Sequence, residues 1–288
     1  MKALPFIIPK PDQANLIYQV DKVKVFYDKL HQHEEIQLSY IVEGQGALVV
    51  GDTVNNYTRG DVLVIGSDIP HVFKSDKDSE ASHMLSLFFT EKSFGQSFFD
   101  LEELKGIQAF FERSKYGFKL NSNQNKAKRL FLQLENASKF NHFVILLQLL
   151  DLMVNSDYKS LSSFVYDKKY SDVDGDRMRN VFEFTLNNYD KDISLEEVSK
   201  IASMTKNAFC KYFKKRTNKT YVQFLNEFRI EMVCKLLKEK SDHSIAEVAY
   251  LSGFRNMSNF NRIFKTIKGG TPSLFLETKK PDSIESGF

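Results

Sequence analysis

The sequence predicts an α+β protein of two domains, a β-rich N-terminal domain that ends in helices and an all-α C-terminal domain. Three observations lead to this fold class. Short apolar blocks separated by turn residues fill the first third of the chain, helical periodicity follows from about residue 123, and one helical pattern occurs twice near the C-terminus. A chain of 288 residues is also long enough for about two domains.

The β-rich region runs from about residue 16 to residue 90, and its strand spacing suits a small antiparallel barrel. Turn signals at residues 43–46, 55–56 and 59–61 separate the apolar blocks. The expected strands are Val23–Leu30, Ile36–Val42, Ala47–Val50, Val62–Ile65 and Met84–Phe89.

Residues 123–155 are predicted to form two helices. The second contains an apolar run at residues 142–154 that is too short to span a bilayer and is interrupted by Gln148 and Asp151. We interpret it as a helix buried against the barrel, and a dimer seam is a compatible alternative. A polar segment that follows is the best linker candidate. The predicted parts are residues 1–165, a linker at 166–176, an all-α domain at 177–280 that opens with a helix at Arg177–Tyr189, and a tail at 281–288.

The pattern that occurs twice is a repeated helix-turn-helix. Residues 194–204 return as residues 244–254, and residues 209–214 return as residues 260–265, so the offset is 50 residues in the first part and 51 in the second. Each copy opens with Ser-x-x-Glu, the capping box that satisfies unpaired amides at a helix start. Apolar residues recur at helical spacing inside each short first helix, and Gly253 suits the sharp turn of the second copy.

The second helix of each copy is the one that we expect in the major groove of DNA, because its outward face is polar and basic. Lysines suit phosphates, whereas asparagine and arginine match base edges. Residues 193–280 carry 17 Lys and Arg against 8 Asp and Glu, while residues 1–192 carry 23 against 27, so the basic charge is concentrated where DNA would bind. The predicted DNA-binding residues are Lys206, Asn207, Cys210, Lys211 and Lys214 in the first copy and Asn256, Met257, Asn259, Arg262 and Lys265 in the second.

Residues 195–275 contain several short motifs at fixed spacing, among them Phe213-Lys-Lys215, Ile245-Ala-Glu-Val-Ala249, Ser252-Gly-Phe254, Ser258-Asn-Phe260, Phe264-Lys265 and Thr271-Pro272. With these motifs the segment resembles the DNA-binding domain of the AraC/XylS family of bacterial transcription regulators. The resemblance implies two helix-turn-helix units joined by a linker helix, here Thr220 to Glu239, opened by a possible capping box from Thr220 to Gln223. Asn218 stands where the family usually has a glycine, and asparagine tolerates the left-handed conformation.

The order of histidines and glycines in the β-rich region resembles the cupin barrel, the usual sensor domain of this regulator family. In an extended segment His31, His33 and Gln37 project to one face, and His71 would approach them inside the barrel. In metal-binding cupins the position of Gln37 is typically glutamate, and an amide oxygen is a weaker ligand than a carboxylate. These four residues are the candidate ligand-binding residues. A polar small-molecule pocket is the favoured interpretation, a metal site and structural histidines stay open, and no metal or cofactor is predicted.

Together these features predict a sequence-specific DNA-binding transcription regulator, an activator that senses a small molecule such as a sugar and has no enzymatic activity. The expected partners are promoter DNA, the effector, a second copy of the chain in a homodimer and RNA polymerase, with no membrane partner. The cysteines Cys210 and Cys234 indicate a reducing compartment, and Pro5 interrupts the start too early for a signal peptide, so we expect a cytoplasmic protein. Two alternatives remain: a metal-dependent cupin enzyme tethered to a DNA-binding domain, and a ligand-independent DNA binder with a degenerate sensor.

Overall fold

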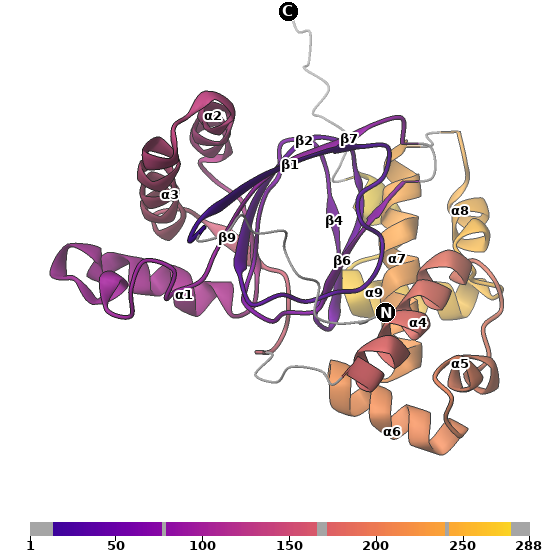
Figure 1. Ribbon diagram of the computed structural model, residues 1–288. Coiled ribbons are helices and arrows are strands. Elements are labelled where there is room, and N and C mark those ends of the chain that lie inside the picture. The colour runs from indigo at the N-terminus through magenta and orange to yellow at the C-terminus, as the bar shows by residue number, and fades with distance from the viewer. Residues whose placement is uncertain (1–13, 77–78, 166–171, 240–241, 278–288) are drawn as a thin grey trace, which may run out of the picture. The chain divides into compact units, whose positions relative to one another are not determined.

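A computed structural model describes residues 14–76, 79–165, 172–239 and 242–277, and the chain divides into two compact units inside helix α4, after Glu183. The described strands all lie in the N-terminal unit, whereas the C-terminal unit is helical (Figure 1). The predicted α+β fold class is therefore confirmed. Helix α4 (Asp172–Asn188) begins five residues before the helix expected at Arg177. The rest of the predicted linker, residues 166–171, and the tail at 281–288 lie outside the described residues.

The N-terminal unit is a sandwich of two antiparallel sheets. One sheet has six strands in the order β1-β7-β2-β5-β8-β9, and the other has three in the order β4-β3-β6. The predicted cupin-like barrel takes the form of two packed sheets, because β1 and β9 end the larger sheet without pairing with each other. The strands are β1 (Ile17–Val23), β2 (Ile36–Glu43), β3 (Gly46–Val50), β4 (Thr53–Tyr57), β5 (Val62–Ile65), β6 (His71–Ser75), β7 (Ser82–Phe89), β8 (Phe118–Leu120) and β9 (Tyr158–Ser160).

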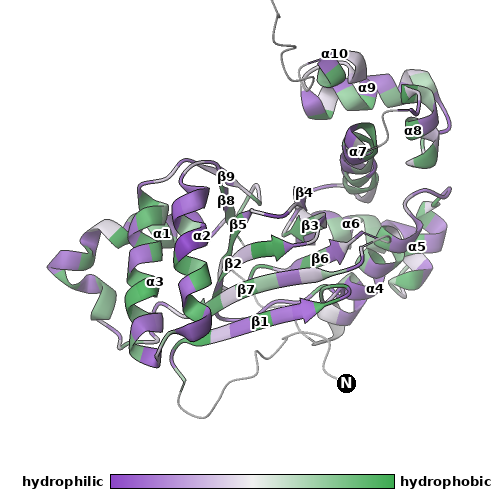
Figure 2. Ribbon diagram, turned by 90° about the horizontal axis from the view of Figure 1, so that it is seen from above, coloured by the Kyte–Doolittle hydropathy of each residue, from purple (hydrophilic) through white to green (hydrophobic). Residues whose placement is uncertain are grey.

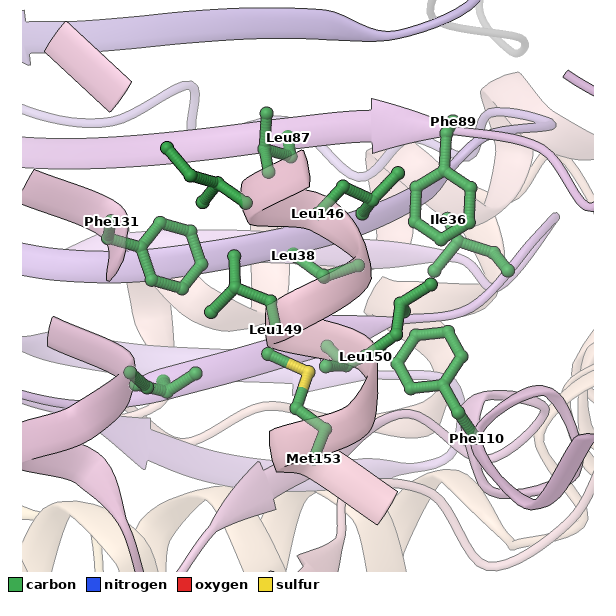
Figure 3. Packing of buried hydrophobic residues seen from close by; sticks show 14 of the residues in the cluster. Ile36, Leu38, Leu87, Phe89, Phe110, Phe131, Leu146, Leu149, Leu150 and Met153 are labelled. Atoms are coloured by element: carbon green, nitrogen blue, oxygen red, sulfur yellow. The ribbon is translucent and has the colours of Figure 1, made fainter. Parts of the chain in front are cut away.

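Helices cover the outer face of the six-stranded sheet. Apolar side chains of α3, among them Leu146, Leu149 and Met153, pack against β-strand residues such as Leu38 and Leu87 (Figure 3). This contact confirms that the apolar run of α3 belongs to a helix buried against the sheet. The helical elements of this unit are the 3₁₀ helices η1 (Phe98–Asp100), η2 (Glu102–Ile107) and η3 (Leu134–Asn136) and the α-helices α1 (Gln108–Ser114), α2 (Gln124–Gln133) and α3 (Lys139–Val154).

A second apolar core fills the space between the two sheets. It joins residues such as Ile41 and Met84 of the larger sheet to Leu48 and Phe73 of the smaller one. Side chains alternate between faces along a strand, so β2 directs its even-numbered apolar residues toward the helices and its odd-numbered residues toward the inside of the sandwich. This alternation is what places Gln37, an odd-numbered residue of β2, in the interior.

The sequence located the central strands better than the outer ones. Strands β2, β3, β5 and β7 match their predictions within two residues. The block expected at Val23–Leu30 is wrong, because β1 lies earlier and ends at Val23. The Asn55-Asn56 pair that was expected to be a turn lies inside β4, where the Asn55 side-chain amide donates to the Leu161 carbonyl at 3.0 Å. A distant segment therefore satisfies a residue that is rare in strands.

The C-terminal unit is built around one long helix. Helix α7 lies between the pair α5–α6 and the pair α8–α9 (Figures 1 and 2), as the predicted linker helix would. No helix in the described parts of the chain is both long and apolar enough to cross a membrane. The helices are α5 (Leu195–Ile201), α6 (Lys206–Thr217), α7 (Tyr221–Glu239), α8 (Ile245–Leu251), α9 (Met257–Lys268) and α10 (Pro272–Glu277).

Candidate DNA interface and sensor pocket

The first helix of each repeat starts at the predicted serine. The Ser244 hydroxyl accepts from the Glu247 amide at 3.2 Å, and the Glu247 carboxylate accepts from the Ser244 amide at 2.7 Å, which completes the capping box. In the first copy the Ser194 hydroxyl accepts from the Glu197 amide at 3.1 Å, and the described contacts contain no return bond from the Glu197 carboxylate. The predicted capping box is therefore complete in the second copy, whereas the first copy has only one of its two hydrogen bonds.

The turns between the paired helices contain a residue with positive φ at the equivalent position of both copies. Gly253 has a φ of +89°, as predicted, and the equivalent Ser203 has a φ of +53°. A Cβ atom at Gly253 would lie 2.5 Å from the Tyr189 carbonyl oxygen and 2.8 Å from Arg229 Nε. Glycine is required there by crowding as well as by conformation. Asn218 ends α6 with a φ of +55°, in agreement with the left-handed conformation expected there.

Helix α7 has a capping box at its N-terminus and hydrogen bonds to the segment after α4. The Thr220 amide donates to Gln223 Oε1 at 2.9 Å and the Gln223 amide donates to Thr220 Oγ1 at 3.2 Å, so the third predicted capping box is present. From the middle of α7, the Arg229 guanidinium donates to the carbonyl oxygens of Tyr189 and Lys191, each at 2.7 Å. These bonds tie the segment after α4 to the helix that joins the two repeats. Sequence reasoning did not assign this role to Arg229.

All ten predicted DNA-binding side chains are exposed on α6, on α9 or at the first turn of α9. Their helices present the opposite face to the core, where Phe209 and Phe213 of α6 and Phe260 and Phe264 of α9 are fully buried. The structure therefore groups the predicted residues into two polar faces: Lys206, Asn207, Cys210, Lys211 and Lys214 on α6, and Asn256, Met257, Asn259, Arg262 and Lys265 on α9.

Four of these side chains already have partners within the protein. Lys206 forms an ion pair with Glu196 at 2.6 Å, Asn256 accepts from the Asn259 amide at 2.9 Å as the N-cap of α9, and Arg262 donates to Asn259 Oδ1 at 2.8 Å. The Glu196 partner raises the pKa of Lys206, chiefly by its hydrogen bond. Asn256 thus has a structural role that the sequence did not indicate. The exposed Lys215 on α6 is a further basic residue that the prediction omitted.

The four candidate ligand residues come together inside the sandwich, although His31 and His33 lie in an irregular segment before β2 and not in an extended strand. A backbone bridge holds His31 opposite His71 at the start of β6, with bonds of 3.0 and 2.8 Å in the two directions. The imidazole ring centroid of His71 lies 4.2 Å from that of His31 and 5.0 Å from that of His33. Gln37 Oε1 lies 3.4 Å from His33 Nε2. The backbone bridge between the segment before β2 and the start of β6 thus brings the cluster together.

Burial lowers the pKa of two imidazoles of this cluster. Loss of hydration, with a smaller contribution from the charge of His33, lowers the pKa of His31 to about 3. The pKa of His71 is also held well below its ordinary value, first by burial and then by its two histidine neighbours. In each ring Nδ1 donates to a backbone carbonyl, so Nε2 carries the lone pair whenever the ring is neutral. The acceptors are Lys29 for His31, Glu35 for His33 and Ile69 for His71, each at 2.8 Å.

A pocket of about 310 Å³ opens onto two of the histidines and Gln37. Gln19 and Asp21 of β1 add polar groups that the sequence did not indicate, and Gln19 Nε2 donates to Asp21 Oδ1 at 2.8 Å. Burial raises the pKa of the Asp21 carboxyl. The remaining lining residues are apolar or aromatic: Val23, Val25, Phe26, Tyr27, Phe73, Met84 and Phe88. A polar set beside an apolar wall is typical of small-molecule sites.

Comparison with known proteins matches both units. A helix-turn-helix domain family model matches residues 198–278, and a cupin domain family model matches residues 23–88. An uncharacterised HTH-type transcriptional regulator of Bacillus subtilis (strain 168), YdeC, is 25% identical over 267 residues, which cover 89% of this chain and 88% of the relative. The HTH-type transcriptional activator RhaR of Mannheimia succiniciproducens is 22% identical over 251 residues, which cover 85% of each chain. The crystal structure of ToxT from Vibrio cholerae O395 aligns with 91% of this chain and 97% of its own, with 15% identity and a TM-score of 0.36.

Proposed function

We propose that this chain, a transcription regulator that combines a cupin domain with an AraC-type helix-turn-helix domain, reads promoter DNA with α6 and α9 and responds to a small molecule in the pocket of its cupin domain. The observation that carries the proposal is the pair of capped helix-turn-helix units whose second helices bury their phenylalanines and expose the predicted polar residues. The named relatives are regulators, which favours binding over catalysis.

The two recognition helices would enter successive segments of the major groove, about 34 Å apart along one face of the DNA. Their outer faces differ, since α6 offers Asn207 and Lys211 where α9 offers Asn259 and Arg262. Arginine and asparagine can make paired hydrogen bonds to guanine and adenine, whereas lysine also suits phosphates. One protein chain would therefore recognise an asymmetric site.

DNA binding is tested with the full-length protein and a site selected from random duplexes. Lys211→Ala and Arg262→Ala should each weaken specific binding by about 1–3 kcal/mol if the side chain reads a base. Lys238→Ala, which removes the same charge from an exposed position on α7, is the matched control and should have a smaller effect. Fluorescence anisotropy measures the affinities. Equal affinity of all three variants and the parent for the selected site would contradict the placement of the recognition helices.

The effector proposed for the pocket is a small polar molecule with an apolar face, such as a sugar. Amide, carboxylate and imidazole groups supply hydrogen bonds, and the aromatic residues supply a surface for an apolar ring face. By linkage, such a molecule changes DNA binding only if it has different affinities for the competent and incompetent states. A thermal-shift screen of sugars and metabolites tests this. If no compound stabilises the protein and deletion of residues 1–165 leaves DNA affinity unchanged, the ligand-independent alternative replaces the sensor.

A homodimer through α2 and α3 would pair two DNA half-sites. The side chains of Leu132 and Phe140 are 44% and 72% exposed, and a shallow groove lies between the two helices next to Val144. Exposed apolar groups of this kind are typical of protein interfaces. Leu132→Glu together with Val144→Glu should shift the protein from dimer to monomer in analytical ultracentrifugation. An unchanged sedimentation coefficient would place the dimer contact elsewhere.

The proposed action is activation of transcription together with RNA polymerase in the cytoplasm. The name of the relative RhaR, a transcriptional activator, supports this direction of control. A reporter gene placed behind the selected site measures it. Higher expression with the intact protein than with Arg262→Ala supports activation, whereas lower expression identifies a repressor.

A further inference from the structure

The carboxylate of Asp21 lies in the wall of the pocket, and the described residues hold no cationic partner for it. Strand β1 pairs with β7 in a register that places Asp21 opposite Met84, and both side chains line the pocket. The group that donates a hydrogen bond to the carboxylate is the neutral amide of Gln19, at 2.8 Å. Burial destabilises the charged form and raises the pKa of this carboxyl. A positively charged ligand would therefore supply a counter-charge that the described pocket wall lacks.

The two side-chain amides of the pocket use their NH₂ groups within the protein. Gln19 donates to the carboxylate just described, and Gln37 Nε2 donates to Ser39 Oγ at 2.9 Å. The amide oxygens are then left to accept hydrogen bonds from a ligand. The imidazole of His31 is also an acceptor through Nε2, because its Nδ1 donates to a backbone carbonyl and burial lowers the pKa of the ring to about 3. A ligand that fits this set brings hydrogen-bond donors.

Aromatic side chains form a large part of the remaining wall. Phe26, Tyr27, Phe73 and Phe88 all line the pocket. The ring centroids of Phe26 and Phe73 lie 5.9 Å apart with an angle of 75° between the ring planes, so the two rings present differently oriented faces. The π-electron face of an aromatic ring attracts cations, and sets of such rings recognise ammonium groups of ligands. The carboxylate and the rings therefore favour the same kind of ligand group.

The described lining of the pocket includes the Asp21 carboxylate but no lysine or arginine. The guanidinium of Arg179 donates to the Leu30 carbonyl at 3.3 Å and does not belong to the lining. A charge on His33 would be balanced by Glu35, whose Oε2 atom lies 4.0 Å from His33 Nδ1. A carboxylate or phosphate ligand would thus meet a like charge and acceptor atoms in this pocket. A neutral polyol would bring hydrogen-bond donors but no charge for Asp21.

We propose that the effector carries an ammonium group, which pairs with the Asp21 carboxylate against the aromatic wall, and that its other donors bond to the acceptors of the pocket. A sugar with an amino group has this chemistry, and so does an aromatic amine. Hydrogen bonds between charged partners are about twice as strong as those between neutral ones, so the charge would distinguish the effector from uncharged relatives. The proposal rests on the proposed function in one respect, namely that the effector binds in this pocket.

Isothermal titration calorimetry of the full-length protein tests the proposal with matched compounds that differ in one group. The sets are glucosamine, glucose and glucuronate; phenethylamine, phenylethanol and phenylacetate; and choline with dimethylbutanol, its uncharged isostere. In a set that fits the pocket, the ammonium compound should bind at least about tenfold more tightly than its uncharged counterpart, and an acid should bind more weakly than either. Equal or tighter binding of the uncharged or acidic compounds would overturn the proposal, and so would failure of all the ammonium compounds to bind.

Variants assign the charge selectivity to Asp21. Asp21→Asn keeps an oxygen that can accept from the Gln19 amide, and it should weaken binding of the ammonium compound about tenfold while leaving the uncharged counterpart unaffected. Asp100→Asn removes the same charge from an exposed position on η1 and should leave both affinities unchanged. Circular dichroism reports on the folding of each variant. Unchanged selectivity in Asp21→Asn, or an equal loss of affinity for both compounds in a folded Asp21→Asn protein, would refute the role of this carboxylate.

Fluorescence anisotropy with the selected DNA site separates this proposal from the proposed function. An ammonium compound that binds through Asp21 and leaves DNA affinity unchanged would confirm the ligand class and refute its role in regulation. Absence of specific DNA binding in every form of the protein would contradict the proposed function, whereas the preference of the pocket for ammonium compounds would still stand on the calorimetry.

Discussion

Replacement of Gly253 by alanine should destabilise the C-terminal unit more than an ordinary glycine-to-alanine change. Two effects combine at this turn. The φ of +89° places the residue in a conformation that an L-residue adopts at a cost of about 1–2 kcal/mol. The new methyl group would also lie 2.5 Å from the Tyr189 carbonyl oxygen, so one of the two groups must move.

The free-energy cost of displacing the Tyr189 carbonyl can be estimated from the hydrogen bond that this carbonyl accepts. It accepts from Arg229 Nε at 2.7 Å, and the Arg229 guanidinium is partly buried. Hydrogen bonds to charged groups contribute about 1.5–3 kcal/mol, and displacement of Tyr189 by the methyl group would weaken this one. The expected loss for Gly253→Ala is therefore about 3 kcal/mol or more.

Gly269→Ala is the matched control. Gly269 also has a positive φ, +76°, and a Cβ atom there would have no neighbour within 4 Å. Only the conformational cost applies, so we expect a loss of about 1–2 kcal/mol. For a unit of this size each kcal/mol lowers Tm by roughly 4–8 °C. Differential scanning calorimetry of the full-length protein measures both variants, and Phe264→Ala identifies the transition of the C-terminal unit.

The comparison between the two glycines decides the interpretation. A much larger Tm decrease for Gly253→Ala than for Gly269→Ala supports crowding between the turn and the Tyr189–Arg229 pair. Equal decreases would refute it and would leave conformation as the whole reason for the glycine.

Two further predictions concern local stability. Ser244→Ala removes the hydroxyl of the complete capping box and should cost about 1 kcal/mol, more than Ser194→Ala, where the box is half formed; calorimetry of the same transition measures both, and the reverse order would contradict the contacts described. Leu149→Ala deletes a fully buried side chain between α3 and the sheet and should cost about 2–5 kcal/mol of N-terminal-unit stability. Lys139→Ala at an exposed position of α3 should change it by less than about 0.5 kcal/mol. Urea unfolding followed by circular dichroism distinguishes the two variants, and similar effects would mean that α3 does not pack as described.

Local signals in the sequence were sufficient to predict the helix starts and buried faces of the C-terminal unit. Ser244-x-x-Glu247 and Thr220-x-x-Gln223 predict helix starts because both partners of a capping box lie within four residues. Apolar spacing likewise predicts which phenylalanines are buried. The return bond that Glu197 does not make depends on side-chain geometry around the helix start, and the motif alone does not specify it.

The strands and the pocket were harder to predict from the sequence, because they depend on contacts between residues far apart in the chain. The local sequence at Asn55 predicts a turn, yet its side-chain amide donates to the carbonyl of Leu161, more than a hundred residues away. Gln19 and Asp21 line the pocket because β1 pairs with β7, and nothing adjacent to them in the chain indicates this. Pairings between distant segments carry no local pattern from which to infer them.

By itself the sequence determined the two-domain α+β class, the duplicated helix-turn-helix and the polar faces of its second helices, since capping and helical periodicity act over a few residues. Only the tertiary structure decided that the strands form two sheets, that Gly253 is crowded by the segment after α4, and that Gln19 and Asp21 line the pocket. The physical reason is that these features require backbone pairing and packing between segments far apart in the chain. The histidine motif in the sequence identified the candidate residues, and the backbone bridge between His31 and His71 places those residues close enough to contact one ligand.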